Sequence, residues 1–134
     1  MVTGIGIDLI ETVRIRRTLD KFSDRFFRRV FTPKEVEYCK SMKFPDRHFA
    51  ARFAAKEAIS KCFGTGIGKQ LGWKDIEIVR DELGKPLVKL HGNGLALAKR
   101  LKIGEVHVSL SHTEHYGCAA AVLVSCHRNT FSMT

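Results

Sequence analysis

Three residues in two segments have side chains that could together handle phosphate chemistry. Asp8 lies in the Ile-rich stretch Gly4–Ile10, where an ionised carboxylate is costly unless a cation, a hydrogen bond or solvent relieves it. Glu57 and Lys61 are four residues apart on a predicted helix, so their side chains share one face. A structural role for Asp8 and an ordinary solvated pair of Glu57 and Lys61 are the simpler interpretations, and these residues taken alone leave both open.

A glycine-rich loop favours an anion site next to Lys61. This lysine falls in the last turn of its predicted helix, directly before the segment Gly64–Lys69, where three glycines allow backbone N–H groups to approach an anion closely. A Walker A loop must open a helix, whereas this loop follows one, so an ATPase or GTPase is excluded. Asp8 and Glu57 would suit Mg²⁺, which takes few protein ligands and completes its shell with phosphate oxygens and water.

The segment Ser109–Thr113 gathers hydroxyl groups and an imidazole at the end of a predicted strand. His112 and His115 have H-x-x-H spacing, but without a helix or a further ligand they predict a zinc site only weakly. No G-x-S-x-G motif surrounds Ser109 or Ser111, which disfavours a serine hydrolase.

Composition is typical of one compact, reduced, cytoplasmic domain. The chain has 134 residues, 44% of them hydrophobic, and four widely spaced cysteines with no C-x-x-C pair. No apolar run approaches the roughly 18 residues of a membrane span, and the start lacks a signal-peptide pattern. We expect a single domain over residues 1–125 and an irregular tail over 126–134. The net charge of +9 predicts attraction to polyanions without naming one.

Periodicity and capping signals predict the elements that position these residues. In the first half we expect a buried strand over 4–10, an amphipathic helix over 12–26 with Phe22 on its apolar face and a break near Ser23, a helix over 33–42 capped by Thr32, and an alanine-rich helix from a cap at Asp46 to Gly64.

The second half of the chain predicts mostly strands. We expect a hairpin formed by 76–79 and 87–90, a helix capped by Asn93, and a strand pair over 106–110 and 118–124. The predicted fold class is therefore α+β, with a largely antiparallel sheet packed against the long alanine-rich helix and shorter helices.

The first predicted helix carries a basic face formed by Arg14, Arg17, Lys21 and Arg25. Such a face is usually solvated, and a docking surface for an acidic helix is the sharper interpretation. A small nucleic-acid-binding module is the rival hypothesis, because the aromatic residues that follow are interleaved with arginines. Those aromatic residues are Phe26, Phe27 and Phe31.

Three motifs in order along the chain identify a family resemblance. They are Gly4-Ile-Gly-Ile-Asp8, Arg52-Phe-Ala-Ala-Lys-Glu-Ala-Ile-Ser-Lys61 and His107-Val-Ser-Leu-Ser-His-Thr113, with supporting matches at Phe31–Glu35 and Glu82–Pro86. The chain resembles the short bacterial holo-acyl-carrier-protein synthases, which are 4'-phosphopantetheinyl transferases, over nearly its whole length.

The resemblance implies a function and a set of sites. The implied reaction is transfer of the 4'-phosphopantetheine group from coenzyme A to a serine of apo acyl carrier protein, with Mg²⁺ as cofactor, in fatty acid biosynthesis. It implies a homotrimer with active sites at subunit interfaces, and neither nucleic acid nor a membrane as partner. The implied roles are metal binding by Asp8 and Glu57, catalysis by Glu57 and Lys61, coenzyme A binding by Lys61, Gly64, Gly66, Pro86, Ser111, His112 and Thr113, and carrier binding by Arg14, Arg17, Lys21 and Arg25.

Overall fold

The structure, a computed structural model, describes residues 1–126. Apart from Cys126, the predicted tail lies outside the described residues. The elements in chain order are β1 (Val2–Glu11), α1 (Thr12–Val30), α2 (Pro33–Lys40), α3 (Pro45–Phe63), η1 (Trp73–Asp75), β2 (Ile76–Arg80), β3 (Pro86–Leu90), α4 (Gly92–Arg100), β4 (Ile103–His112) and β5 (Tyr116–Ser125). Among these described helices, none is long and apolar enough to cross a membrane.

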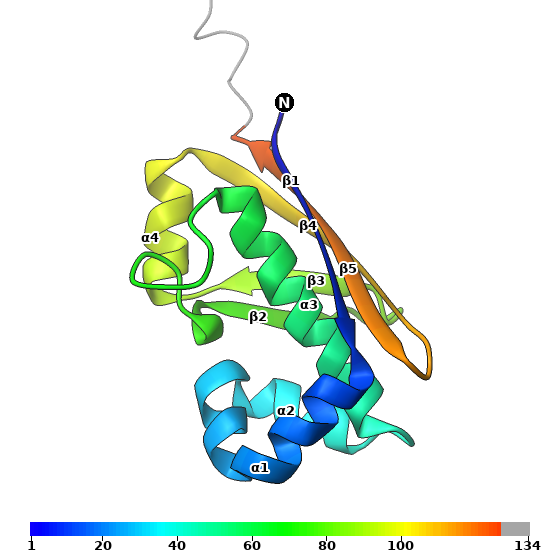
Figure 1. The fold of residues 1–134 in the computed structure, drawn as a ribbon. Coiled ribbons are helices and arrows are strands. Elements are labelled where there is room, and N and C mark those ends of the chain that lie inside the picture. The colour runs from blue at the N-terminus through cyan, green and yellow to red at the C-terminus, as the bar shows by residue number, and fades with distance from the viewer. Residues whose placement is uncertain (127–134) are drawn as a thin grey trace, which may run out of the picture.

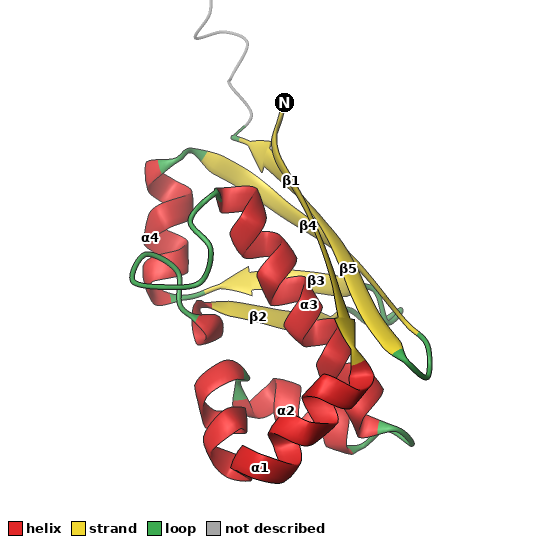
Figure 2. Cartoon of the chain, viewed as in Figure 1, coloured by secondary structure: helices red, strands yellow, loops and turns green. Residues whose placement is uncertain are grey.

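A three-stranded antiparallel sheet and a separate hairpin flank the long helix α3. The sheet has the order β1-β5-β4, and β2 pairs with β3. In Figure 1, α3 runs along one face of the sheet, with the hairpin on its other side and α1 and α2 together at one end. Figure 2 shows the same division, with helices gathered on a single side of the three-stranded sheet. The predicted α+β class with an antiparallel sheet is confirmed.

Small residues allow α3 to lie almost against the backbone of the sheet. Its alanines at 50, 51, 54, 55 and 58 are buried. Glycines in the strands face it: a Cβ on Gly6 would collide with the carbonyl oxygen of Ala58, and one on Gly4 with that of Cys62. Only glycine permits so close an approach of two backbones. The motif glycines of β1 thus set the distance between β1 and α3.

Helix α1 bends where its sequence predicted a break. Ser23 has φ 44° and ψ −122°, far from helical values, and the helix continues to Val30, beyond the expected end near Phe26. The bend changes which side chains face inward, because residues on either side no longer share one helical phase. Phe22, predicted on the apolar face, is therefore 45% exposed, whereas Phe26 packs against Phe53.

Two predicted helix caps are wrong and two are confirmed. Thr32 and Glu35 form the reciprocal capping box of α2, and Gly64 ends α3 in the left-handed conformation. Helix α3 begins at Pro45, so Asp46 lies in its first turn and binds Arg16 of α1 instead of capping the helix. Helix α4 begins one residue before Asn93, at Gly92.

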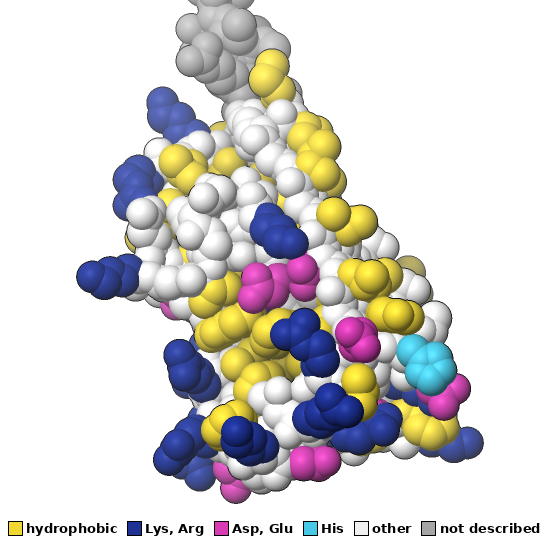
Figure 3. Space-filling view, in the orientation of Figure 1, with side chains coloured by type: hydrophobic (Ala, Val, Ile, Leu, Met, Phe, Trp, Pro, Cys, Tyr) yellow, Lys and Arg dark blue, Asp and Glu magenta, His cyan; other side chains and the backbone are white. Residues whose placement is uncertain are grey.

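Strand β1 is not buried on both faces, contrary to the prediction. Its pattern alternates, so that Gly6 and Ile10 are buried while Ile5, Ile7 and Leu9 are 75%, 70% and 62% exposed. These apolar side chains lie on the sheet face opposite α3, and Figure 3 shows hydrophobic groups following this edge of the molecule. The register continues the face through Cys118, Ala120 and Val122 of β5.

Candidate active site

The structure brings Asp8, Glu57 and Lys61 together from two elements. Asp8 projects from β1 towards α3, which carries the other two residues one helical turn apart. The Lys61 Nζ atom donates to the Asp8 Oδ1 atom and to the Ile7 carbonyl oxygen, each at 3.0 Å. Lys61 therefore pairs with Asp8 across the two elements, and the simple helical pair with Glu57 is not what forms.

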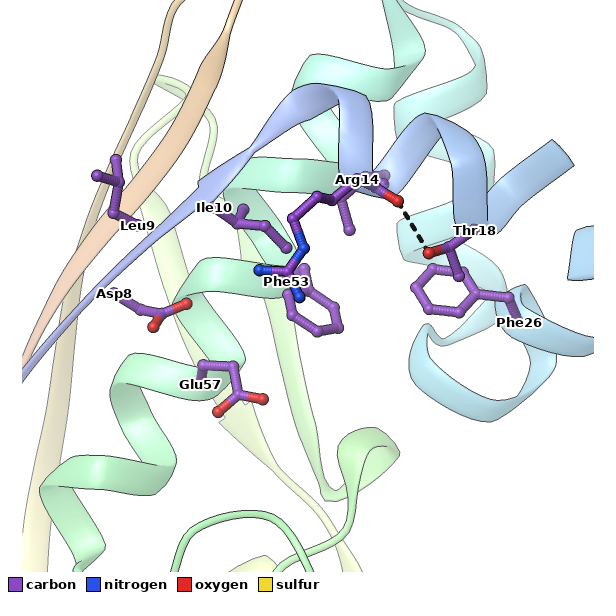
Figure 4. Close-up of a pocket in the computed structure, with 9 residues that line it drawn as sticks. Asp8, Leu9, Ile10, Arg14, Thr18, Phe26, Phe53 and Glu57 are labelled. Atoms are coloured by element: carbon purple, nitrogen blue, oxygen red, sulfur yellow. Dashed lines mark hydrogen bonds between the residues drawn. The ribbon is translucent and has the colours of Figure 1, made fainter. Parts of the chain in front are cut away.

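A cavity of about 310 Å³ lies beside these carboxylates, between α1 and α3. Figure 4 shows Asp8 and Glu57 at one side, with the guanidinium of Arg14 extending from α1 into the same space. Phe26 and Phe53 form the apolar wall. The cavity thus combines two acids, one guanidinium and an aromatic surface. The full lining consists of Asp8, Leu9, Ile10, Arg14, Ile15, Thr18, Phe26, Phe53 and Glu57.

The two carboxylates interact electrostatically. Burial raises the pKa of Glu57, the negative charge of Asp8 raises it further, and Lys61 acts in the opposite direction. A cation near the two carboxylates would offset the effect of the Asp8 charge on Glu57. Within residues 1–126, no group of three or more His, Cys, Asp or Glu side chains is arranged as a metal site, so a cation here would have only two protein ligands.

The loop after Lys61 is open to a ligand. Gly64 and Gly66 have φ values of 79° and 64°, which favour glycine, and no atom lies within 4 Å of where a Cβ would stand on either residue. The N–H groups of both glycines already donate within the chain, Gly64 to the Lys61 carbonyl oxygen and Gly66 to that of Ser60, so the loop offers open space and not free donors at these two positions.

The other predicted nucleotide-binding residues lie elsewhere in this chain. Strand β5 separates β4 from β1, so Ser111, His112 and Thr113 do not line the cavity beside Asp8. Ser111 lies on the open sheet face, in register with Cys118. The Thr113 hydroxyl accepts hydrogen bonds from two backbone N–H groups in the β4–β5 turn.

His112 belongs to a second, strongly basic cluster on the α3 side of the sheet. Its ring lies 4.6 Å from that of His48, between centroids. Arg52 and Arg80 both lie over the ring of Tyr38, 4.2 and 4.8 Å from its centroid. Burial and then the charges of Arg47, Arg52 and Arg80 lower the pKa of His112.

His48 responds in the same way, since burial and nearby cations lower its pKa to about 4. Pro86 is paired in register with Arg80 and so lies at the margin of this cluster. Pro86 and His112, far apart in sequence, are thus connected through one group of arginine, histidine and tyrosine side chains.

Sequence reasoning missed this cluster and a buried ion pair. Arg52 and Lys56 stood in the recognised motif but had no assigned role. Lys56 and Glu35 are completely buried and 2.7 Å apart. A lysine within an alanine-rich, otherwise buried helix face was the available signal, because a buried charge requires a partner.

The structure disfavours both the nucleic-acid-binding hypothesis and the zinc-site hypothesis, because the residues on which they depended are placed differently. Phe31 is 1% exposed and Phe27 packs against Phe49, so these aromatics belong to the core and are not a platform for bases. His112 packs on His48, whereas His115 lies near Glu114 in the turn that follows β4.

Comparison with known proteins defines the class. The sequence profile of the 4'-phosphopantetheinyl transferase superfamily matches residues 4–121. The chain belongs to this superfamily.

Curated relatives give the match a finer description. The chain is 44% identical over 124 residues to the holo-[acyl-carrier-protein] synthase of Geobacter sp. strain M21, covering 92% of this chain and 98% of that protein. It is 48% identical over 120 residues to the enzyme of the same name from Moorella thermoacetica, covering 90% and 92%.

Solved structures agree with the fold. The holo-[acyl-carrier-protein] synthase of Neisseria meningitidis superposes with a TM-score of 0.87 at 34% identity, covering 93% of this chain and all of that one. The Helicobacter pylori synthase, solved in complex with coenzyme A, gives a TM-score of 0.81 at 32% identity, with coverages of 90% and 99%.

Proposed function

We propose that this chain transfers the 4'-phosphopantetheine group of coenzyme A to a serine of apo acyl carrier protein, in the cytoplasm and in the service of fatty acid biosynthesis. The observation that carries the proposal is the convergence of Asp8, Glu57 and Lys61 beside one cavity in a member of the phosphopantetheinyl transferase superfamily.

The reaction balances without any further reactant. The serine Oγ atom forms a bond to the β-phosphorus of coenzyme A, and the bond between that phosphorus and the oxygen bridging to the α-phosphorus breaks. Adenosine 3',5'-bisphosphate leaves with the bridging oxygen. The serine proton passes to a base, for which Glu57 beside the cavity is the candidate, either directly or through a metal-bound water.

Mg²⁺ fits the residues present. Asp8 and Glu57 supply two hard oxygen donors whose mutual repulsion a cation relieves, and Mg²⁺ commonly uses only one or two carboxylates together with substrate phosphates. When bound, the ion would supply Lewis-acid polarisation of the phosphates. Lys61 donates to the Asp8 Oδ1 atom, so its ammonium group lies next to one of the proposed metal ligands.

The chain's own groups would orient the pyrophosphate and neutralise its charge. Lys61 is half exposed and can turn from Asp8 to a phosphate oxygen. Gly64 and Gly66 leave open space beside Lys61 for a phosphate, because no atom lies within 4 Å of where a Cβ would stand on either residue. Phe26 and Phe53 would give the incoming serine an apolar wall on one part of the cavity.

The nucleotide end of coenzyme A suits the second cluster. Arg47, Arg52 and Arg80 together make a site for a phosphate group, and His112 borders it. This assignment retains His112 and Pro86 as nucleotide-binding residues, with Ser111 and Thr113 beside them on β4 and in the following turn.

A homotrimer explains why the predicted site is divided. The acids and Lys61 lie on the β1 side of the sheet, whereas His112 lies on β4, across β5. The exposed face formed by Ile5, Ile7 and Leu9 offers an apolar surface for another copy. In such an assembly the acids of one subunit would meet the basic cluster of its neighbour.

Carrier binding is assigned to α1. Arg14 lines the cavity, and Arg17, Lys21 and Arg25 are exposed on the same helix. An acidic carrier helix docked there would deliver its serine beside Glu57, and the charge of α1 would speed the encounter at low salt.

Mass spectrometry of an apo acyl carrier protein tests the function. Incubation with this protein, coenzyme A and Mg²⁺ should add about 340 Da to the carrier, with metal-chelated samples as a control for the cofactor. Asp8→Ala and Glu57→Ala should abolish the gain. No gain with several carriers would remove the transferase proposal.

Sedimentation tests the trimer separately. Ile7→Glu places a charge on the apolar sheet face and should shift the sedimentation coefficient from that of a trimer towards a monomer. Leu83→Glu is the matched control, because Leu83 is 95% exposed in the turn between β2 and β3. A wild-type chain that sediments as a monomer at all concentrations would contradict the assembly.

A further inference from the structure

Lys56 is the most completely buried cation of the described chain, and it lies next to Glu57 in sequence. Its side chain has no exposed surface, and its pKa is lowered because burial disfavours the charged form, with Glu35 acting against that effect. A buried charge is retained only where its hydrogen-bonding capacity is met. The hydrogen-bond partners of Lys56 therefore indicate its structural role.

Three acceptors surround the Lys56 ammonium group, each from a different element. The Nζ atom donates to the Val30 carbonyl oxygen at 2.7 Å, to the Glu35 Oε1 atom at 2.7 Å and to the Trp73 carbonyl oxygen at 3.0 Å. Val30 is the last residue of α1, Glu35 belongs to the capping box of α2, and Trp73 begins η1. All three donor positions of the ammonium are used.

This arrangement ties the two walls of the cavity together. One wall, with Arg14 and Phe26, belongs to α1; the other, with Phe53 and Glu57, belongs to α3. Lys56 joins the end of α1 to α3, one residue before Glu57 in the sequence. The contact of β1 with α3 is set by the glycines of β1 instead and does not involve Lys56.

We propose that Lys56 is a positioning residue that fixes α1 against α3 and thereby sets where the carrier serine arrives relative to Glu57. The inference rests on the proposed transferase function. Lys56 itself would touch neither substrate. It acts through α1, so its loss should affect the carrier and not coenzyme A. The pyrophosphate site beside Asp8 and Lys61 is held by the β1–α3 contact, and the arginines of the proposed nucleotide site are not among the Lys56 hydrogen-bond partners.

The experiment compares Lys56→Met with Lys99→Met, an exposed lysine on α4. Both variants are assayed with coenzyme A and Mg²⁺ at a temperature where circular dichroism shows them folded. Lys56→Met should raise the KM for the carrier at least about tenfold and leave the KM for coenzyme A within about twofold. Lys99→Met should change neither constant.

Tryptophan fluorescence supplies a readout that needs no activity. Trp73 is the only tryptophan in the sequence, and its ring stacks on Phe53 at 4.8 Å between centroids. Because the Trp73 carbonyl oxygen accepts from Lys56, Lys56→Met should shift the emission maximum, and Lys99→Met should not. If the wild type transfers nothing, the proposed function fails, while the fluorescence shift still reports on the position of η1.

Equal increases in both KM values, or an unchanged carrier KM, would overturn the proposal. Lys56→Gln is a second variant for the case that Lys56→Met does not fold, since its amide can still donate to two of the three acceptors. The same selective rise in carrier KM is expected, to a smaller extent. If neither variant folds even with coenzyme A and Mg²⁺ present, Lys56 is a folding residue and the positioning role is wrong.

Discussion

The ammonium group of Lys61 and the carboxylate of Asp8 are joined by a 3.0 Å ion pair, although the two residues are 53 positions apart in the chain. This pair connects β1 to the last turn of α3. Because the Lys61 side chain is half exposed, solvent weakens the attraction. Its proposed purpose is to hold the ammonium group ready for a phosphate.

Lys61→Gln should therefore weaken coenzyme A binding while leaving the fold intact. Loss of a charge-assisted hydrogen bond to a phosphate costs roughly 1.5–3 kcal/mol, or about 10- to 100-fold in affinity. Calorimetric titration of coenzyme A measures the change, with Lys99→Gln as the charge-matched control. An unchanged affinity would make the pair with Asp8 purely structural.

Glu57→Gln should abolish transfer and raise thermal stability at pH 7. The folded-state pKa of Glu57 is raised, by burial first and Asp8 second, so the folded state favours the protonated form. Stability from this group is present below its unfolded pKa and is lost as the pH rises through the folded one. At pH 7 the glutamine variant does not lose this stability, because its side chain does not ionise.

Thermal unfolding as a function of pH measures this effect. The difference in Tm between Glu57→Gln and wild type should disappear below the ordinary pKa of glutamate, where the wild-type carboxyl group is protonated in both states. Addition of Mg²⁺ should stabilise the wild type more than the variant. A variant less stable than wild type at pH 7 would contradict the raised pKa.

Gly6→Ala should separate β1 from α3. The added Cβ collides with the carbonyl oxygen of Ala58, so the two backbones must move apart. Overpacking of this kind costs about 1–3 kcal/mol and displaces Asp8 from Glu57 and Lys61. Urea unfolding and the transfer assay measure the two effects.

Gly68→Ala is the matched control for that substitution. Its Cβ would have no atom within 4 Å, and its φ lies outside the left-handed region. Stability and activity close to wild type are expected. Equal losses in both alanine variants would contradict a specific role of the β1–α3 distance.

Charge reversal on α1 should weaken only carrier binding. Arg14→Glu combined with Arg17→Glu replaces two cations by two anions on the proposed docking helix, which should raise the carrier KM at least about tenfold at low salt and less at high salt. The KM for coenzyme A should hardly change. Reversal of Lys99 and Arg100 on α4 gives the matched control, and a similar rise there would indicate only a general charge effect.

Local signals predicted much of the fold because they depend on near neighbours. The capping box of Thr32 and Glu35, the helix end at Gly64 and the break at Ser23 each follow from a few adjacent residues. Asp46 failed as a cap since Pro45 already occupies the first turn and Arg16, thirty residues away, attracts its carboxylate. Long-range partners of this kind leave no trace in local sequence.

The site was predictable in part for the same reason. Family motifs named Asp8, Glu57 and Lys61, and the fold brings them together. Adjacent strand residues such as Ser111 and His112 always lie on opposite faces, but which of them faces α3 depends on the tertiary structure, which motif order does not contain. The arginine cluster around Tyr38 involves α2, α3 and β2 and required the tertiary structure.

Helix α3 makes a different essential contact on nearly every side. Arg52 stacks on Tyr38, Phe53 faces the cavity, Lys56 binds three other elements and Ala58 touches β1. Successive residues of a helix are about 100° apart, so a slip of one position would misdirect all of these contacts at once. Divergence among related chains should therefore spare α3 and accumulate in α1 and α4, and a redesign of this fold would best start from α3 as its fixed axis.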